Sequence, residues 1–166
     1  DERVANNTFS GHAVDLRTVE STNATIADNA FESGIFVDGK RYGNYQGDLE
    51  YLQHELSNNT VGGDPLFYAT SVDDPVVPAD AGQVIVFNAT NVTVADQSFE
   101  GIASPIQLTY SEAVYVSNVS VVDSPIDGAT IGVSENVSIS ESSISGSGGH
   151  GILAEEVGAF TVYESV

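Results

Sequence analysis

The stretch NVTVADQSF at residues 91–99 recurs as AVYVSNVSV at 113–121, NVSISESSI at 136–144 and AFTVYESV at 159–166. These copies start 22, 23 and 23 residues apart, and an earlier copy, NATIADNAF, occupies 23–31. Within each copy, Val, Ile and Phe alternate with polar residues, which is the pattern of a strand with one buried face. The chain is therefore a tandem repeat built from short strands.

A second apolar pair precedes each copy, for example Val84 and Val86 or Ile106 and Leu108. Each unit thus holds about three short strands, separated by the Gly, Ser, Asn and Asp that tight corners favour. These dimensions predict one turn of a parallel β-helix, with equivalent residues stacked about 4.8 Å apart between coils. A leucine-rich repeat has a similar length, but its LxxLxLxxN consensus does not occur in the sequence.

The repeat also predicts how the chain is organised. We expect a single all-β domain over 1–166 with about five coils, of which the regular ones occupy 82–166. Residues 39–81 are expected to form an inserted helix and loop excursion, because turn residues crowd this segment. A short helix within GDLEYLQHEL is predicted, capped by Asp48, with Leu49, Leu52 and Leu56 on one face. Since bare coil ends expose strand edges, we expect a fragment of a longer chain or self-association through the ends.

The charge balance excludes some functions. The chain has 4 basic and 24 acidic residues, a net charge of −20, with no Lys or Arg after Arg41. Binding to a nucleic-acid backbone is therefore excluded. No apolar run approaches the roughly 20 residues of a spanning helix, and the absence of Cys excludes disulfides and thiolate chemistry. Because concentrated salt screens such a surface, we expect a haloarchaeal origin.

Glycosylation sequons are frequent. Seven N-x-[ST] sequons begin at Asn6, Asn23, Asn58, Asn88, Asn91, Asn118 and Asn136. N-linked glycans on a surface protein are one explanation. The repeat itself is the other explanation, because Asn23, Asn91 and Asn136 share one repeat position where an asparagine tolerates left-handed geometry.

The segment NNTVGGDPLFYATSVDDPVVPADAGQVIVFNATNVTVADQSF at 58–99 resembles one shared by NosD-like proteins. This resemblance implies a pectin-lyase-like, right-handed parallel β-helix, a fold also used by carbohydrate-binding proteins and sugar hydrolases, and a repeat common in archaeal surface proteins. The namesake of the family helps to deliver copper. Copper delivery is not expected here, because Met and Cys are both absent.

The sequence contains one catalytic-looking constellation. The Gly149-His150-Gly151 string resembles the G-H-G motif of polygalacturonases, and Asp127 lies 23 residues, or one coil, before His150. The two side chains should therefore stack within about 5 Å. His12 falls in the same column if the first coil carries two extra residues. That family's N-T-D and R-x-K strings do not occur after residue 42, and an inverting glycosidase needs a second carboxyl group, for which Asp123 is the nearest candidate.

Other candidate contacts are weaker. No cofactor or resident metal is predicted, although Glu155 with Glu156, Asp73 with Asp74, or Asp123 with Asp127 could hold a hard cation weakly. Aromatic rings that could stack on sugars, or pack the excursion against the coils, are Tyr42, Tyr45, Tyr51, Phe67 and Tyr68.

These observations favour a non-enzymatic extracellular or cell-surface module, structural or polysaccharide-binding, whose partners are polysaccharide or other surface proteins. A polysaccharide-active glycosidase or lyase using Asp127 and His150 is the first alternative. A subunit of a cellular or viral surface appendage is the second.

Overall fold

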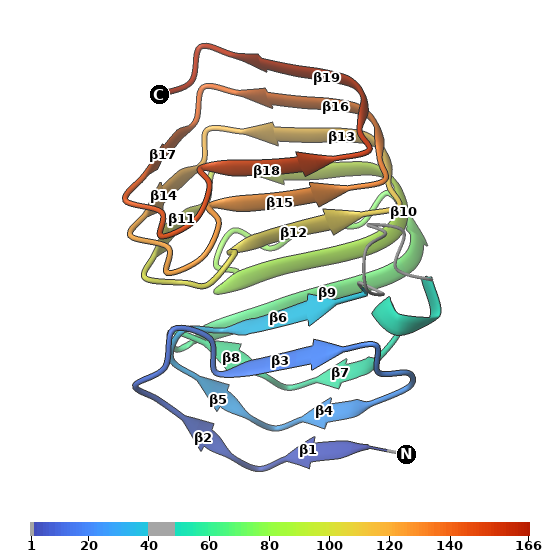
Figure 1. Cartoon of the computed structure of the whole chain (residues 1–166), viewed down its shortest axis with the longest axis vertical. Helices are drawn as coiled ribbons and strands as arrows, with labels where there is room; N and C mark the ends of the chain where they lie inside the picture. The colour runs from blue at the N-terminus through green and yellow to red at the C-terminus, as the bar shows by residue number, and fades with distance from the viewer. Residues whose placement is uncertain (1, 40–48) are drawn as a thin grey trace.

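Short parallel strands wind into two stacks of coils (Figure 1). The computed structural model describes residues 2–39 and 49–166, and this part of the chain contains nineteen strands and one four-residue helix. Neighbouring strands are one repeat apart, so that Val92 pairs with Val114 and Val114 with Val137. The predicted all-β parallel β-helix is confirmed, with about seven turns rather than five.

The N-terminal stack has three columns of strands. The first contains β1 (Arg3–Ala5), β4 (Thr25–Ala27) and β7 (Glu55–Ser57). The second contains β2 (Thr8–Phe9), β5 (Ala30–Phe31) and β8 (Thr60–Val61). The third contains β3 (Leu16–Val19) and β6 (Ile35–Asp38), and the 3₁₀ helix η1 (Leu49–Leu52) precedes β7.

The C-terminal stack starts with two long strands, β9 (Asp64–Asp73) and β10 (Gln83–Ala95), each of which runs through two columns. The first half of β10 is followed upward by β12 (Ile106–Thr109), β15 (Ala129–Gly132) and β18 (Ile152–Glu155). Its second half is followed by β13 (Glu112–Ser117), β16 (Glu135–Ser140) and β19 (Gly158–Tyr163). The third column contains β11 (Ser98–Glu100), β14 (Ser120–Val122) and β17 (Ser143–Ser145).

The core consists of side chains stacked in register along the axis. Val84, Ile106 and Ala129 form one inward column, and each is at most 1% exposed. Val92 and Val114 begin another, with no exposed surface. β-branched residues suit these positions, because their stiff side chains pack well on a pleated surface.

The predicted excursion over 39–81 was wrong for residues 55–73. β7 and β8 continue the sheets of the N-terminal stack, and β9 pairs along β10. Between β8 and β9 the chain reverses at Gly62 and Gly63, both with positive φ, so that these two strands are antiparallel. This reversal interrupts the 22–23-residue period, which is why the sequence pattern hid the strands.

The predicted helix is also shorter than expected. Only Leu49–Leu52 is helical, while Leu56 lies in β7. Leu52 is buried and the other two leucines pack against the core, but the predicted cap, Asp48, lies outside the described residues.

Two glutamine side chains connect the stacks. Among the strands that the structure describes, β6 pairs only with β3. On its other edge, the Ile35 N–H donates to Gln83 Oε1 at 3.1 Å and the Val37 N–H donates to Gln107 Oε1 at 3.1 Å. Both glutamine amides donate back to the carbonyl of Ile35, each at 2.8 Å. Side-chain amides therefore complete this strand edge, where an unpaired backbone group would be costly.

Three corners connect the strands of each coil. Corner A leads from β12 to β13 and from β15 to β16, corner B leads from β13 to β14, and corner C leads from β14 to β15. The equivalent turns of the other coils carry the same letter. Residues with positive φ recur at all three corners, as tight bends between strands require.

Candidate functional site

Asp127 and His150 meet at corner C of the C-terminal stack. Asp127 Oδ1 accepts the backbone N–H of His150 at 2.7 Å and lies 2.9 Å from His150 Nδ1. Because a carboxylate oxygen only accepts, the ring donates this hydrogen bond from a protonated Nδ1. The Asp127 side chain is 8% exposed and the His150 side chain 66%, so a buried carboxylate orients an exposed imidazole.

Glycines make room for this contact. A Cβ on Gly149 would lie 2.5 Å from Asp127 Oδ1, and one on Gly148 would lie 2.5 Å from the carbonyl oxygen of Pro125. The backbone N–H of Gly149 donates to Ile126 O at 2.7 Å, which ties the two loops together. The glycine-rich turn before His150 is thus explained by close packing of successive coils.

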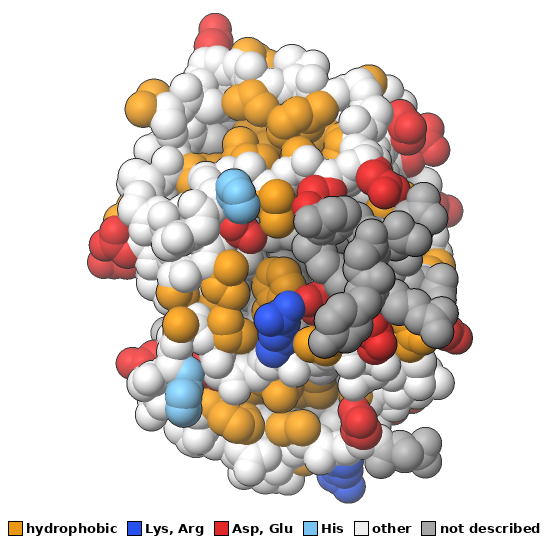
Figure 2. Space-filling model, in the orientation of Figure 1, with side chains coloured by type: hydrophobic (Ala, Val, Ile, Leu, Met, Phe, Trp, Pro, Cys, Tyr) orange, Lys and Arg blue, Asp and Glu red, His pale blue; other side chains and the backbone are white. Residues whose placement is uncertain are grey.

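A second His–carboxylate pair lies at corner C of the N-terminal stack. His12 Nδ1 is 3.6 Å from Asp15 Oδ1, and Asp15 Oδ2 accepts the backbone N–H groups of Ser33 at 2.6 Å and Gly34 at 3.2 Å. Here the two partners are on one coil, whereas Asp127 and His150 are on neighbouring coils. Histidine side chains of both stacks project from the same face of the molecule (Figure 2).

All seven sequon asparagines are exposed and have positive φ. Asn6, Asn58 and Asn118 are at corner B, and Asn23 is at corner A. We count Asn88, Asn91 and Asn136 with corner A, because their positive φ marks the bend inside β10 and at the start of β16. None is at corner C. The amides of Asn58 and Asn118 donate to the preceding coil's Asp28 and Asp96 at 3.2 Å and 2.6 Å.

Comparison with known proteins decides the family. A family model described as a right handed beta helix region matches residues 1–166. The chain belongs to this family. No curated protein and no solved structure matched the chain. The handedness implied by the NosD-like resemblance thus agrees with the family, and the β-helix provides a rigid frame on which each corner residue repeats.

The chemistry of this β-helix site is limited. Asp127 Oδ1 accepts both the backbone N–H and the ring Nδ1–H of His150. The Asp123 carboxylate lies so close to Gly146 that a Cβ on this glycine would contact it. The pair required for inverting hydrolysis, with an acid and a base on opposite sides of a bond, is thus not evident in the described residues. A cleft of about 60 Å³ between β6 and the outer face of β15 contains neither Asp127 nor His150, and it is far smaller than typical ligand pockets.

The aromatic residues selected from sequence are mostly structural. Phe67 and Tyr68 pack against the core, and the Tyr68 hydroxyl donates to Leu52 O at 2.6 Å. Tyr51 is half-buried, while Tyr42 and Tyr45 lie outside the described residues. In the part of the chain that the structure describes, the exposed rings are instead Tyr115, Phe160 and Tyr163, on β13 and β19.

Weak cation binding by the acidic pairs stays a prediction. No group of three or more His, Cys, Asp or Glu suited to a metal ion is found within residues 2–39 and 49–166. Asp73 Oδ1 accepts a hydrogen bond from the Thr90 hydroxyl at 2.5 Å. In the same ranges, no helix has the length and apolar character needed to cross a bilayer.

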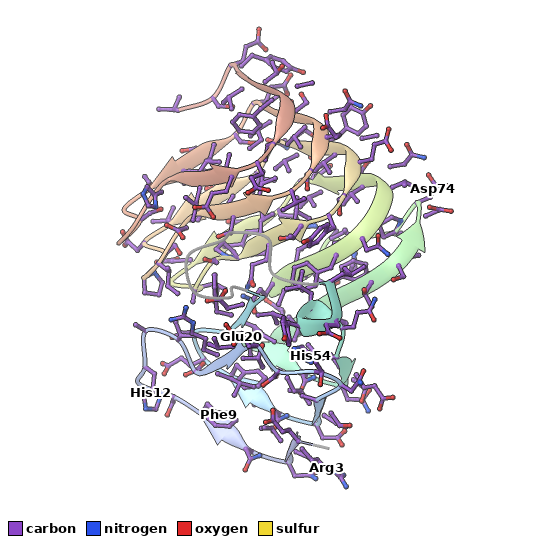
Figure 3. All side chains as sticks on the ribbon, turned by 45° about the vertical axis from the view of Figure 1, so that its right-hand side comes forward. Arg3, Phe9, His12, Glu20, His54 and Asp74 are labelled. Atoms are coloured by element: carbon purple, nitrogen blue, oxygen red, sulfur yellow. The ribbon has the colours of Figure 1, made fainter. Side chains whose placement is uncertain are left out.

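Sequence reasoning missed the buried histidine, His54 (Figure 3). Its Nδ1 accepts the backbone N–H of Ala24 at 3.3 Å, so that the ring's proton is on Nε2, a buried atom without a hydrogen-bond partner among the described residues. Burial lowers the pKa of His54, partly offset by the charge of Glu2. Burial likewise raises the pKa of Tyr68, whose hydroxyl accepts the His54 N–H at 2.9 Å.

Proposed function

We propose that this chain is a non-enzymatic β-helix module of an extracellular or cell-surface protein, with N-linked glycans on corners A and B. The observation that carries the proposal is the distribution of the sequons. All seven lie at two corners, each with an exposed acceptor asparagine.

Left-handed geometry alone does not explain this distribution. Corner C also has positive-φ positions, and they are occupied by Gly11, Gly34, Gly101, Ser104, Asp123 and Gly146, with no asparagine. If the bend were the only requirement, asparagine would be expected at corner C as well, since it is among the best non-glycine residues for this conformation.

The spacing of the acceptors along the axis supports the same conclusion. In one column Asn6 and Asn58 are separated by Asp28, and in another Asn91 and Asn136 are separated by Ala113. Acceptors in a column are therefore about 10 Å apart, two coil spacings, which leaves room between neighbouring glycans.

Asparagines that serve packing behave differently. Asn7, Asn29 and Asn59 occupy directly adjacent coils, and their side-chain amides hydrogen-bond in sequence at 3.1 Å and 3.0 Å. None of these three residues begins a sequon. The ladder therefore joins asparagines of adjacent coils to one another, whereas the sequon amides of Asn58, Asn88 and Asn118 bond to an Asp or Ser of the preceding coil.

Two further features support an exterior, halophilic setting. The NosD-like segment at 58–99 resembles archaeal surface proteins, and the acidic side chains are spread over the visible face of the molecule (Figure 2). A surface with a net charge of −20 is favoured where concentrated counter-ions screen it. Exposed rings such as Tyr115 on β13 and Tyr163 on β19 are suited to stacking on sugars.

Intact-mass measurement of the protein from its native source tests the proposal. A mass above the 17.4 kDa of the polypeptide, increasing in hexose steps, is expected. The variant Thr93→Ala keeps Asn91 but destroys its sequon, so it should lose one glycan. Thr161→Ala, in the same outward column but in no sequon, is the matched control and should lose none. An unmodified wild-type mass would refute the proposal.

A further inference from the structure

We propose that His12 and Asp15, at corner C of the N-terminal stack, bind a divalent transition-metal ion of the Zn²⁺ type. The site is separate from the Asp127–His150 pair and from the sequon corners. Figure 3 shows His12 projecting outward from the edge of this stack, where solvent and ions reach the ring.

The first argument is an oxygen that lacks a hydrogen bond. The Asp15 side chain has no exposed surface, and its Oδ2 is fixed by the backbone N–H groups of Ser33 and Gly34. Its Oδ1 is buried and has no hydrogen-bond partner among the described residues. A buried carboxylate oxygen in this state is costly, and either a donor or a cation would relieve the cost.

The second argument is the distance to the histidine. The separation of 3.6 Å between His12 Nδ1 and Asp15 Oδ1 is too long for a hydrogen bond. With Zn–N and Zn–O distances of about 2.0–2.2 Å, however, two ligands of one ion at this separation enclose an angle of about 120°. This angle is compatible with a four-coordinate ion.

The other stack provides a comparison. At the second pair, His150 Nδ1 lies 2.9 Å from Asp127 Oδ1, and the same oxygen also accepts the His150 N–H. That carboxylate oxygen is already satisfied, and no space remains between it and the ring for an ion. The two pairs therefore differ in what metal binding requires, which is a carboxylate oxygen without a hydrogen bond and enough space for an ion between this oxygen and the ring.

The remaining ligands are water molecules, because His12 and Asp15 are not joined by a third His, Asp or Glu ligand among the described residues. The nearby Glu32 carboxylate accepts the backbone N–H of Gly11 at 2.7 Å, which holds the turn before His12 in place. The His12 side chain is 64% exposed, so water can occupy open positions. Imidazole with carboxylate oxygen suits Zn²⁺, whereas Ca²⁺ and Mg²⁺ prefer oxygen ligands alone.

Calorimetric titration with Zn²⁺ in excess Ca²⁺ tests the site, because Ca²⁺ occupies non-specific carboxylates. One Zn²⁺ site is expected, weakened on the order of 10- to 100-fold in His12→Ala. Asp15→Asn should also weaken it, since the amide oxygen still accepts from Ser33 and Gly34 and thus keeps the corner folded. His150→Ala is the matched control and should bind as wild type does.

The histidine ring signals in an NMR titration provide a second readout. The signals of His12 should shift first, with those of His150 unchanged at one equivalent of Zn²⁺. Absence of a Zn²⁺ site in excess Ca²⁺, unchanged affinity in His12→Ala, or an equal loss in His150→Ala would each overturn the proposal.

Discussion

The amide of Gln83 stabilises the junction between the two stacks, and its replacement tests this role. Gln83 has no exposed surface, accepts the N–H of Ile35 and donates to the carbonyl oxygens of Ile35, Ala103 and Ser104. In Gln83→Met the side chain keeps its length but loses every one of these hydrogen bonds. Its volume is nearly unchanged, so the packing cost is small.

The magnitude follows from the groups left without a partner. The carbonyls of Ile35 and Ser104 still accept from Gln107 Nε2, at 2.8 Å and 3.3 Å. The N–H of Ile35 and the carbonyl of Ala103 lose the Gln83 amide. Each unsatisfied buried group costs about 1–3 kcal/mol, which gives a loss of about 2–6 kcal/mol. This is a large share of the stability of an ordinary domain.

Urea unfolding in molar salt measures the loss, and Gln97→Met is the matched control. Gln97 is also buried, but its amide donates to Pro78 O alone, at 2.9 Å, so its replacement should cost about 1 kcal/mol. Hydrogen exchange at the Ile35 amide should accelerate only in Gln83→Met. Equal losses in the two variants, or unchanged exchange at Ile35, would refute the reasoning.

Three further predictions concern pH, salt and the asparagine ladder. Burial lowers the pKa of His54 below its ordinary 6.5, so the unfolded chain binds the proton at a higher pH than the folded protein does. The free energy of unfolding should therefore fall as the pH drops below 6.5. In urea unfolding at several pH values, His54→Gln should remove this dependence. Glu112 and Glu135 are exposed and paired on neighbouring coils, so Glu135→Gln should raise the melting temperature at low salt but not at molar salt; an equal shift in both would contradict a charge effect. Asn29→Leu removes two ladder contacts and should cost about 2–4 kcal/mol in urea unfolding, whereas a loss under about 1 kcal/mol would show that the ladder is dispensable.

The regular coils could be predicted because their information is local and repeated. A period of 22–23 residues with alternating Val and Ile fixes the strand type, the inward face and the register. The same arithmetic placed Asp127 next to His150, since a separation of 23 residues is one coil. The sequence alone could not indicate that Asp127 also accepts the His150 N–H.

The sequon corners were only partly predictable. The sequence placed Asn23, Asn91 and Asn136 at one repeat position, and the structure adds that all seven acceptors avoid corner C. To see this difference between the corners, one must know which residues have positive φ at every corner, and these positions depend on where each strand ends. A motif search cannot supply them.

The sequence by itself determined a repetitive, acidic, all-β chain, because each coil repeats the same short-range requirements for alternation and bending. Only the tertiary structure decided the chain reversal at Gly62 and Gly63, the Gln83 and Gln107 junction, and the burial of His54. These features join residues up to 72 positions apart and occur once each. A contact that is neither local nor repeated leaves no periodic signal, so it emerges only when the two stacks pack together.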